Sequence, residues 1–160
     1  MAAETRPSVY VETTVPSYLT AWPSRDVILL GHQQTTKLFW DAAPARYDLV
    51  ISEAVLEEIS AGDAGAAAER IRILAALPVL QRQPQVDELA LYYRQLLQLP
   101  DRAAANALHL AFAVVYEVDY LVTWNMKHLA NGAVQRAISI ANDDRGIHVP
   151  LIVTPEALLE

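Results

Sequence analysis

Carboxylate and amide side chains occur at or just after several predicted strands, and their chemistry is considered first. Glu12 closes the first predicted strand, and Glu58 lies in a short helix after the second. Thr123 and Asn125 follow the fourth strand, and Asn106 lies in the first turns of an apolar helix. Ligands of α/β proteins collect at the carboxyl ends of parallel strands. Oxygen ligands of this kind suit Mg²⁺ or Mn²⁺, which can activate water and stabilise the leaving oxygen of a phosphodiester.

Each of these residues also has a purely structural interpretation. Glu12 can be a solvated strand end that caps the following helix, and Glu57 and Glu58 can form a solvated helix face. Asn106 can be a buried amide whose hydrogen bonds are satisfied within the fold, because burial without a partner would be unfavourable. Asn125 is also a common turn residue after a strand. The residues taken one at a time therefore leave function and structure both open.

Several other chemistries are excluded by the absence of their motifs. The chain has no cysteine, so thiolate zinc sites, disulfides and cysteine nucleophiles are ruled out. It contains no phosphate-cradling glycine loop, no H-E-x-x-H pair and no G-x-S-x-G elbow. His109 lies three residues after Asn106, and we interpret it as a core histidine that bonds to a backbone carbonyl. The aromatic residues are interpreted as core or interface residues, including Trp22, Trp40 and Trp124.

Length and charge set the broad class of the protein. The 160 residues predict a single domain spanning 1–160, and 53% apolar residues are enough for a folded core. The net charge of −7 argues against a broad basic face for nucleic acid. No apolar signal region or membrane-spanning stretch is found, so we expect a cytoplasmic protein with no membrane partner.

Strand and helix signals alternate along the chain. We expect strands at 9–11, 47–51, 78–80, 120–123 and 149–153, and helices at 25–42, 53–60, 64–76, 84–97, 102–116 and 127–140. A turn or short helix over 13–18 would be capped by Thr14, and Ser24 would cap the helix that follows it. Val27 and Leu38 would lie on the apolar face of that helix. The alternation predicts a three-layer α/β/α sandwich with a mostly parallel central sheet.

Four stretches, taken in order, resemble the motifs of PIN domains. The first is VYVETTVPSYL over 9–19, a hydrophobic strand that ends in an acidic residue followed by Thr. The second runs over 50–62 with Glu58 at the acidic position, the third is ANALHLA over 105–111, and the fourth is DYLVTWNMKHL over 119–129. The similarity covers nearly the whole chain and is greatest to the VapC-like toxin subgroup.

This resemblance implies a metal-dependent ribonuclease fold, commonly the toxin of a toxin–antitoxin pair. It makes Glu12 the first ligand of Mg²⁺ or Mn²⁺ and Glu58 the second acid. Asn106 stands where the family usually has Asp, and Asn125 stands where many members have Asp. Thr123 would orient the metal-bound water or a neighbouring carboxylate. The resemblance also implies a homodimer and a small antitoxin partner.

Asn106 is a departure from the family pattern with a physical consequence. An amide oxygen can ligate a hard cation but brings no charge, and one unit charge at about 4 Å contributes about 4 kcal/mol of gross interaction at an effective dielectric near 20. Another carboxylate could compensate, and the candidates are Asp26, Asp63 and Asp101. Local phosphate contacts could come from Arg25, Lys127 and His128.

Three functions are therefore compared. The first is a toxin-type endoribonuclease that hydrolyses RNA with Mg²⁺ or Mn²⁺. The second is a catalytically weak or inactive PIN scaffold that acts by binding proteins, which the Asn106 position and the acidic pI of about 5.0 favour. The third is an unrelated α/β domain with a structural or small-molecule role, which would not bring Glu12, Glu58, Asn106 and Asn125 together.

Overall fold

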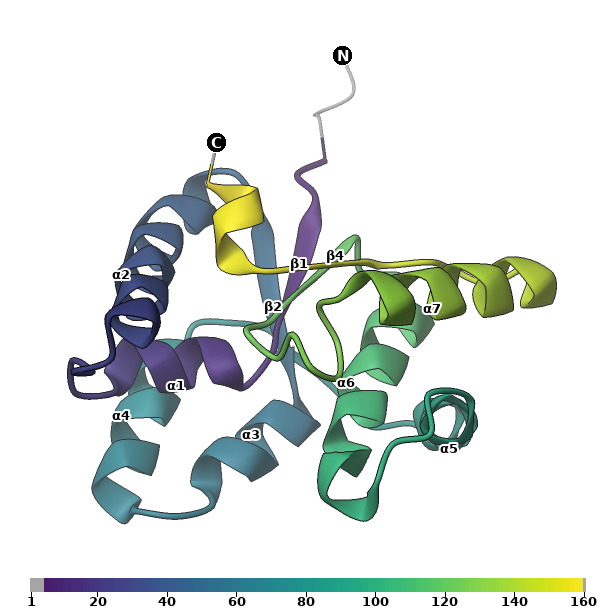
Figure 1. Ribbon diagram of the computed structural model, residues 1–160, viewed down its shortest axis with the longest axis horizontal. Coiled ribbons are helices and arrows are strands. Elements are labelled where there is room, and N and C mark those ends of the chain that lie inside the picture. The colour runs from purple at the N-terminus through teal and green to yellow at the C-terminus, as the bar shows by residue number, and fades with distance from the viewer. Residues whose placement is uncertain (1–4, 160) are drawn as a thin grey trace.

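A five-stranded, all-parallel sheet forms the centre of the protein, with helices packed around it (Figure 1). A computed structural model describes residues 5–159. The strand order is β3-β2-β1-β4-β5. The strands are β1 Ser8–Val11, β2 Asp48–Ser52, β3 Val79–Leu80, β4 Tyr120–Val122 and β5 Leu151–Val153.

The helices fall on either side of β1 in Figure 1, with α1, α2 and α4 on one side and α5, α6 and α7 on the other. Their bounds are α1 Thr14–Thr20, α2 Val27–Ala42, α3 Glu53–Ser60, α4 Ala64–Leu74, α5 Pro84–Leu96, α6 Ala104–Val115 and α7 Gly132–Arg145. Short 3-10 turns lie at Ala43–Ala45, Asp101–Ala103 and Pro155–Leu158. The predicted α/β sandwich is confirmed, and the described strands are all parallel rather than mostly so.

The register of the sheet decides which side chains meet at its C-terminal edge. Val11 of β1 is the register partner of Val122 of β4, so the residues that follow these strands are neighbours. The backbone N–H of Glu12 extends this pairing by donating to the carbonyl of Val122 at 3.1 Å. On the other side of β1, Tyr10 pairs with Val50 of β2, which ends two residues later at Ser52. Parallel pairing thus places Glu12 between the ends of β2 and β4.

The core is built on β1 and α6. Val9, Tyr10 and Val11 have no exposed surface, as expected for a central strand buried on both faces. Helix α6 is buried nearly all round, and its buried residues include Ala107, Leu110, Ala111, Phe112 and Ala113. The rigid packing of this helix fixes the direction of the polar side chains that it carries.

The start of α2 differs from the sequence prediction. Asp26, not Ser24, is the N-cap, because its carboxylate accepts hydrogen bonds from the backbone N–H groups of Ile28 and Leu29. Val27 and Leu38 are 80% and 61% exposed, so they do not lie on the buried face as predicted.

The predicted cap of α1 was also wrong. Thr14 is the first residue of that helix, and its side chain binds Glu12 instead of capping a helical N–H. Thr13 occupies the N-cap position without a side-chain capping bond.

The helix predicted over 127–140 was misplaced. Helix α7 begins at Gly132, capped by Asn131, whose side-chain oxygen accepts from the N–H of Val134 at 2.9 Å. The preceding segment forms a turn, because the side-chain oxygen of Asn125 accepts from the backbone N–H of His128. The helix then continues to Arg145 and ends at Gly146, whose φ of +65° suits a glycine.

Other boundaries agree with the sequence predictions to within a few residues. Helix α3 has the predicted bounds, and Ser52 caps it by accepting from the N–H of Val55. Within residues 5–159, the structure contains no helix with the length and apolar character needed to cross a bilayer.

Candidate functional site

Glu12 is a buried carboxylate held at one of its two oxygens. Glu12 is 3% exposed. Its Oε2 accepts hydrogen bonds from the backbone N–H of Thr14 at 2.9 Å, from the hydroxyl of Thr14, and from the hydroxyl of Thr123 at 2.8 Å. Within residues 5–159 the structure shows no hydrogen bond to Oε1. The residue is therefore fixed in position with one oxygen left for another partner.

The segment after β4 connects Glu12 to Asn106. Thr123, which donates to Glu12, accepts from the backbone N–H of Asn125 at 2.9 Å. The side-chain amide of Asn125 donates to Oδ1 of Asn106 at 3.0 Å. The side-chain oxygen of Asn125 in turn accepts from the backbone N–H of His128. Both amide oxygens thus already have one donor each, and each keeps a second lone pair.

Glu58 approaches the same edge from α3. Its side chain is 37% exposed, and Oε1 accepts from the hydroxyl of Thr13 at 3.0 Å and binds Nε2 of His109. Burial opposes the charged form, but the hydrogen bonds from His109 and Thr13 and the charge of His109 outweigh it. As a result the pKa of Glu58 lies below its ordinary value of 4.5.

His109 is completely buried, and its partners are not the one predicted. Instead of a backbone carbonyl it binds two side chains, Glu58 through Nε2 and the hydroxyl of Tyr10 through Nδ1 at 2.6 Å. Tyr10 also bonds to the hydroxyl of Ser52 at 2.6 Å. The sequence carried a signal for this network, because Tyr10 lies two residues before Glu12 on one strand and His109 lies three residues after Asn106 on one helix.

These contacts connect the candidate residues into one group. Glu12 is joined through Thr123 and Asn125 to Asn106, and α6 carries both Asn106 and His109. His109 bonds to Glu58, and Thr13, which is adjacent to Thr14, bonds to Glu58 as well. The structure therefore brings together the residues that the unrelated-domain alternative would have left apart.

The remaining acidic candidates lie outside this network. Glu57 is exposed and faces Arg82 at 4.0 Å. Asp26 and Asp63 cap helices, and Asp101 forms an exposed ion pair with Arg94. Among the described residues no group of three or more His, Cys, Asp or Glu side chains could hold a metal. None of the three aspartates thus supplies the carboxylate that Asn106 lacks.

Trp124 anchors the segment after β4 to the neighbouring helices. The indole stacks on His32 with ring centroids 4.2 Å apart and on Tyr18 at 5.9 Å, and its Nε1 donates to the hydroxyl of Thr36 at 2.7 Å. Its backbone N–H donates to the hydroxyl of Thr14 at 2.9 Å. Trp124 is 4% exposed, which fits the core interpretation, whereas Trp22 is 92% exposed and is not a core residue.

The donor set fits a hard divalent cation. Oε1 of Glu12 and Oε2 of Glu58 accept no hydrogen bond from the described part of the chain, and the amide oxygens of Asn106 and Asn125 retain lone pairs. Carboxylate and amide oxygens are the ligands that Mg²⁺ and Mn²⁺ favour. The set has only two formal charges, so the cation it suits is one that also keeps several waters.

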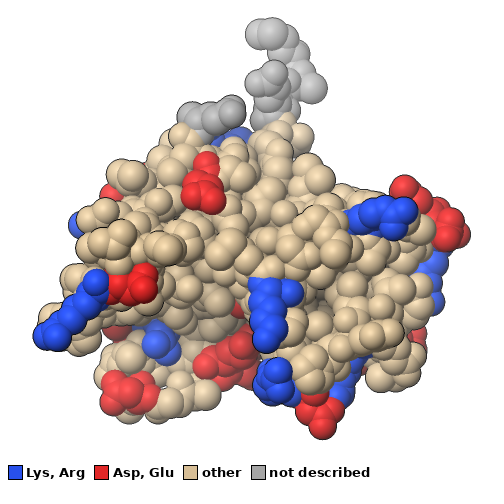
Figure 2. All heavy atoms as spheres, in the orientation of Figure 1, with Lys and Arg blue, Asp and Glu red and all other residues tan. Residues whose placement is uncertain are grey.

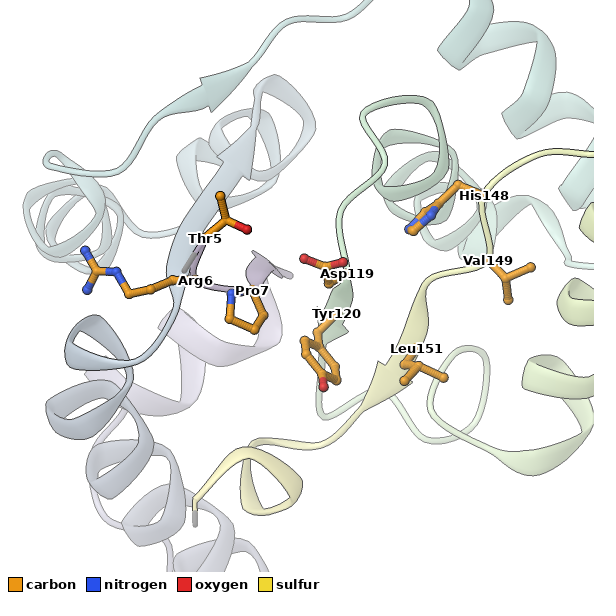
Figure 3. Close-up of a pocket in the computed structure, with 8 residues that line it drawn as sticks. All are labelled: Thr5, Arg6, Pro7, Asp119, Tyr120, His148, Val149 and Leu151. Atoms are coloured by element: carbon orange, nitrogen blue, oxygen red, sulfur yellow. The ribbon is translucent and has the colours of Figure 1, made fainter. Parts of the chain in front are cut away.

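A separate cavity of about 420 Å³ lies at the opposite, N-terminal edge of the sheet (Figure 3). It is lined by residues that include Pro7, Asp119 and His148, and by none of the candidate site residues. Oδ2 of Asp119 accepts from both the backbone N–H and the hydroxyl of Ser8. These contacts join β1 to the start of β4 and are structural.

The order of the parallel strands and the helices around them define a PIN-like α/β fold of the VapC type. Two solved structures show the likeness. One is VapBC2 from Rickettsia felis bound to a DNA fragment from its promoter, with 15% identity, a TM-score of 0.53, and coverage of 91% of this chain and 97% of that one. The other is a toxin-antitoxin complex from Klebsiella pneumoniae, with 18% identity, a TM-score of 0.59, and coverage of 92% and 98%.

Sequence comparisons add nothing to this structural likeness. No family model matches the chain, and no curated protein matches it. The similarity of this chain to the two solved structures therefore indicates its fold alone.

Proposed function

We propose that this protein is a metal-dependent endoribonuclease of the VapC-like toxin type, which hydrolyses phosphodiester bonds in RNA. The observation that supports it best is the hydrogen-bonded group at the C-terminal edge of the sheet. There two carboxylates from β1 and α3 join two amides from α6 and the segment after β4. Four separate parts of the chain contribute these groups. If each residue only capped its own helix or strand, the groups would not need to come together.

In this proposal Glu12, Glu58, Asn106 and Asn125 hold Mg²⁺ or Mn²⁺. The cation, when bound, would supply activation of water and stabilisation of charge on the phosphate. Thr123 and Thr14 hold Oε2 of Glu12, so that Oε1 is the ligand atom. Thr13 and His109 both bind Oε1 of Glu58, which leaves Oε2 for the cation. The threonines therefore act on the carboxylates rather than on the metal-bound water.

RNA would be bound by few cations. On the face in Figure 2, basic and acidic side chains are interspersed among uncharged ones and form no continuous basic area. Arg25 and Lys127 are exposed, and His128 is half-buried beside Asn125. We propose these three residues as local phosphate contacts.

We also propose that this chain binds a partner protein and forms a dimer. Both similar structures are described as VapBC2 or as a toxin-antitoxin complex, which supports a small antitoxin as the partner of this chain. A homodimer, a cytoplasmic location and a single domain over 1–160 complete the proposal. Light scattering tests the dimer, because its mass would be twice the 17.7 kDa of one chain.

Cleavage of RNA with Mg²⁺ or Mn²⁺ tests the proposed activity. Glu12→Gln and Glu58→Gln remove one charge each and should abolish cleavage. Glu57→Gln is the matched control, because it makes the same change in the same helix at an exposed residue that faces Arg82. Equal cleavage by all four proteins would refute the proposed site.

A second candidate function is a PIN scaffold that acts by protein binding. It is favoured by one observation, the hydrogen bond from the amide of Asn125 to Asn106, which gives Oδ1 of Asn106 a donor without a cation. Vigorous cleavage by the wild-type protein that is lost in Glu12→Gln would exclude the scaffold.

A further inference from the structure

A chain of buried polar side chains leads to Glu58. Ser52, Tyr10 and His109 have no exposed surface, although each carries polar atoms. The hydroxyls of Ser52 and Tyr10 are 2.6 Å apart, and the Tyr10 hydroxyl is 2.6 Å from Nδ1 of His109. Nε2 of His109 then binds Oε1 of Glu58. The chain thus runs from the end of β2 across β1 and α6 to α3.

The chemistry of the groups fixes the direction of the hydrogen bond that reaches Glu58. An ionised Glu58 can only accept, so Nε2 of His109 must carry the proton that it shares with Glu58. The hydroxyl of Tyr10 can donate to Nδ1 or accept from it, so it supports the ring in both cases. Burial holds the pKa of Tyr10 well above its ordinary value of 10.0, so the phenol stays protonated. Ser52 bonds to the same hydroxyl and accepts from the N–H of Val55.

The packing keeps the rings from turning. Tyr10 meets His109 edge-on, with ring centroids 5.7 Å apart and planes at 61°, and stacks on Phe112 at 6.4 Å. An imidazole rotated by half a turn would place its two nitrogens away from both partners, and buried polar atoms without partners are costly. The packing therefore keeps the Nε2–H bond directed at Glu58.

We propose that Tyr10 and His109 are positioning residues: their contacts fix the orientation of the imidazole ring and thereby hold Oε1 of Glu58 in place. Thr13 binds the same oxygen from the other side, at 3.0 Å. Together the two donors occupy Oε1 and leave Oε2 without a hydrogen bond from the described residues. The consequence for metal binding rests on the proposed function, in which Glu58 is a ligand, whereas the orientation of the imidazole and of Glu58 does not.

Nitrogen and carbon NMR of the metal-free protein tests this positioning role directly. We expect Nε2 of His109 to carry a proton. Tyr10→Phe should shift the imidazole nitrogens and the carboxyl carbon of Glu58. Tyr93→Phe is the matched control, because Tyr93 is also fully buried and its hydroxyl makes one hydrogen bond, to Asn142 at 2.6 Å. It should leave these signals unchanged.

Titration with Mn²⁺, monitored by electron paramagnetic resonance, tests the effect of this positioning on metal binding. His109→Phe should weaken Mn²⁺ binding by about 10–100-fold, and Tyr10→Phe, one bond further away, by about threefold or more. Tyr93→Phe should bind as the wild type does. If His109→Phe does not fold, Tyr10→Phe, which retains the imidazole, still tests whether this network affects Mn²⁺ binding.

Two results would overturn this positioning role. One is a wild-type His109 whose Nε2 carries no proton. The other is a Tyr10→Phe protein whose Glu58 carboxyl signal matches the wild type. A wild-type protein that shows the proton at Nε2 and the expected shift in Tyr10→Phe, yet binds no Mn²⁺, would refute the proposed metal site and leave the positioning role supported.

Discussion

At the scale of single residues, Glu12 and Glu58 differ in how they are held. Glu12 is nearly inaccessible, and three donors meet one of its oxygens. Glu58 is more exposed and depends on one threonine and one histidine. Both patterns leave one carboxylate oxygen without a described hydrogen bond. The chemistry of the site therefore depends on partners that orient carboxylates, in addition to the carboxylates themselves.

Acid should remove part of the stability that Glu58 contributes. Its pKa is lowered in the folded protein, so the contribution is present above the ordinary value of 4.5 and is lost as the pH falls through the lower, folded pKa. In chelator, the free energy of unfolding of the wild type should therefore fall as the pH drops from about 5 to below 4, and that of Glu58→Gln should fall less. Urea denaturation at each pH measures this.

Glu57→Gln provides the control for the acid experiment. This residue makes the same charge change on the same helix but faces solvent and Arg82. Its free energy of unfolding should follow the wild-type dependence on pH. An identical dependence for Glu58→Gln and Glu57→Gln would contradict the contacts described for Glu58.

At the scale of elements, the sequence was informative about strands and helices and less so about the segment after β4. Apolar runs predicted all five strands, which include the buried central strand β1 and the partly exposed edge strands β3 and β5. The turn before α7 was missed because it depends on side chains of Asn125 and Asn131 binding backbone N–H groups, which helix propensity does not register. The true cap of α2, Asp26, differs from Ser24 by two residues for the same reason.

Thr36→Val should weaken the attachment of the segment after β4 to α2. The substitution keeps the shape of the side chain and removes the oxygen that accepts from Nε1 of Trp124. Because a buried indole N–H would lose its partner, the free energy of unfolding should fall by about 1–3 kcal/mol. Thr20→Val is a matched control, since Thr20 also donates to a carbonyl four residues earlier but has no indole partner.

Chemical denaturation compares the two threonine variants. Thr20→Val should cost less than about 0.5 kcal/mol. Equal losses in both variants would show that the bond to Trp124 does not stabilise the fold.

At the scale of the whole molecule, net charge and local charge give different answers. A charge of −7 argues against RNA as a partner, yet among the acids of residues 5–159 only Glu12 and Glu58 enter the candidate site. The order of the motifs predicted the fold and the four ligand candidates. It could not predict that Asn125 bonds to Asn106 or that His109 bonds to Glu58, because those contacts depend on how helices and strands distant in sequence are packed.

Few phosphate contacts should make RNA binding only weakly dependent on salt. Each Lys or Arg contact to single-stranded RNA contributes a slope of about −0.7 in log K against log salt, so the two such contacts among the three proposed, Arg25 and Lys127, together predict about −1.4. Fluorescence anisotropy with the Glu12→Gln protein, which should bind without cleaving, measures this slope. Lys127→Ala should reduce it by about 0.7.

The second lysine of the chain provides the control for the salt experiment. Lys37 is exposed on α2, and Lys37→Ala should leave the slope unchanged. A slope that responds equally to both substitutions would contradict the proposed role of Lys127.

The most direct test of the central claim compares RNA cleavage by the wild type and Asn106→Asp across a range of Mn²⁺ concentrations. Asn106→Asp supplies a third carboxylate beside Asn125 without changing the size of the side chain. We predict Mn²⁺-dependent cleavage by both proteins. The variant should reach its half-maximal rate at no more than about one tenth of the Mn²⁺ concentration that the wild type needs. An inert wild type beside an active variant would favour the scaffold function. Cleavage by neither protein at saturating Mn²⁺, or equal cleavage by both in chelator, would contradict a metal-dependent nuclease site at this edge of the sheet.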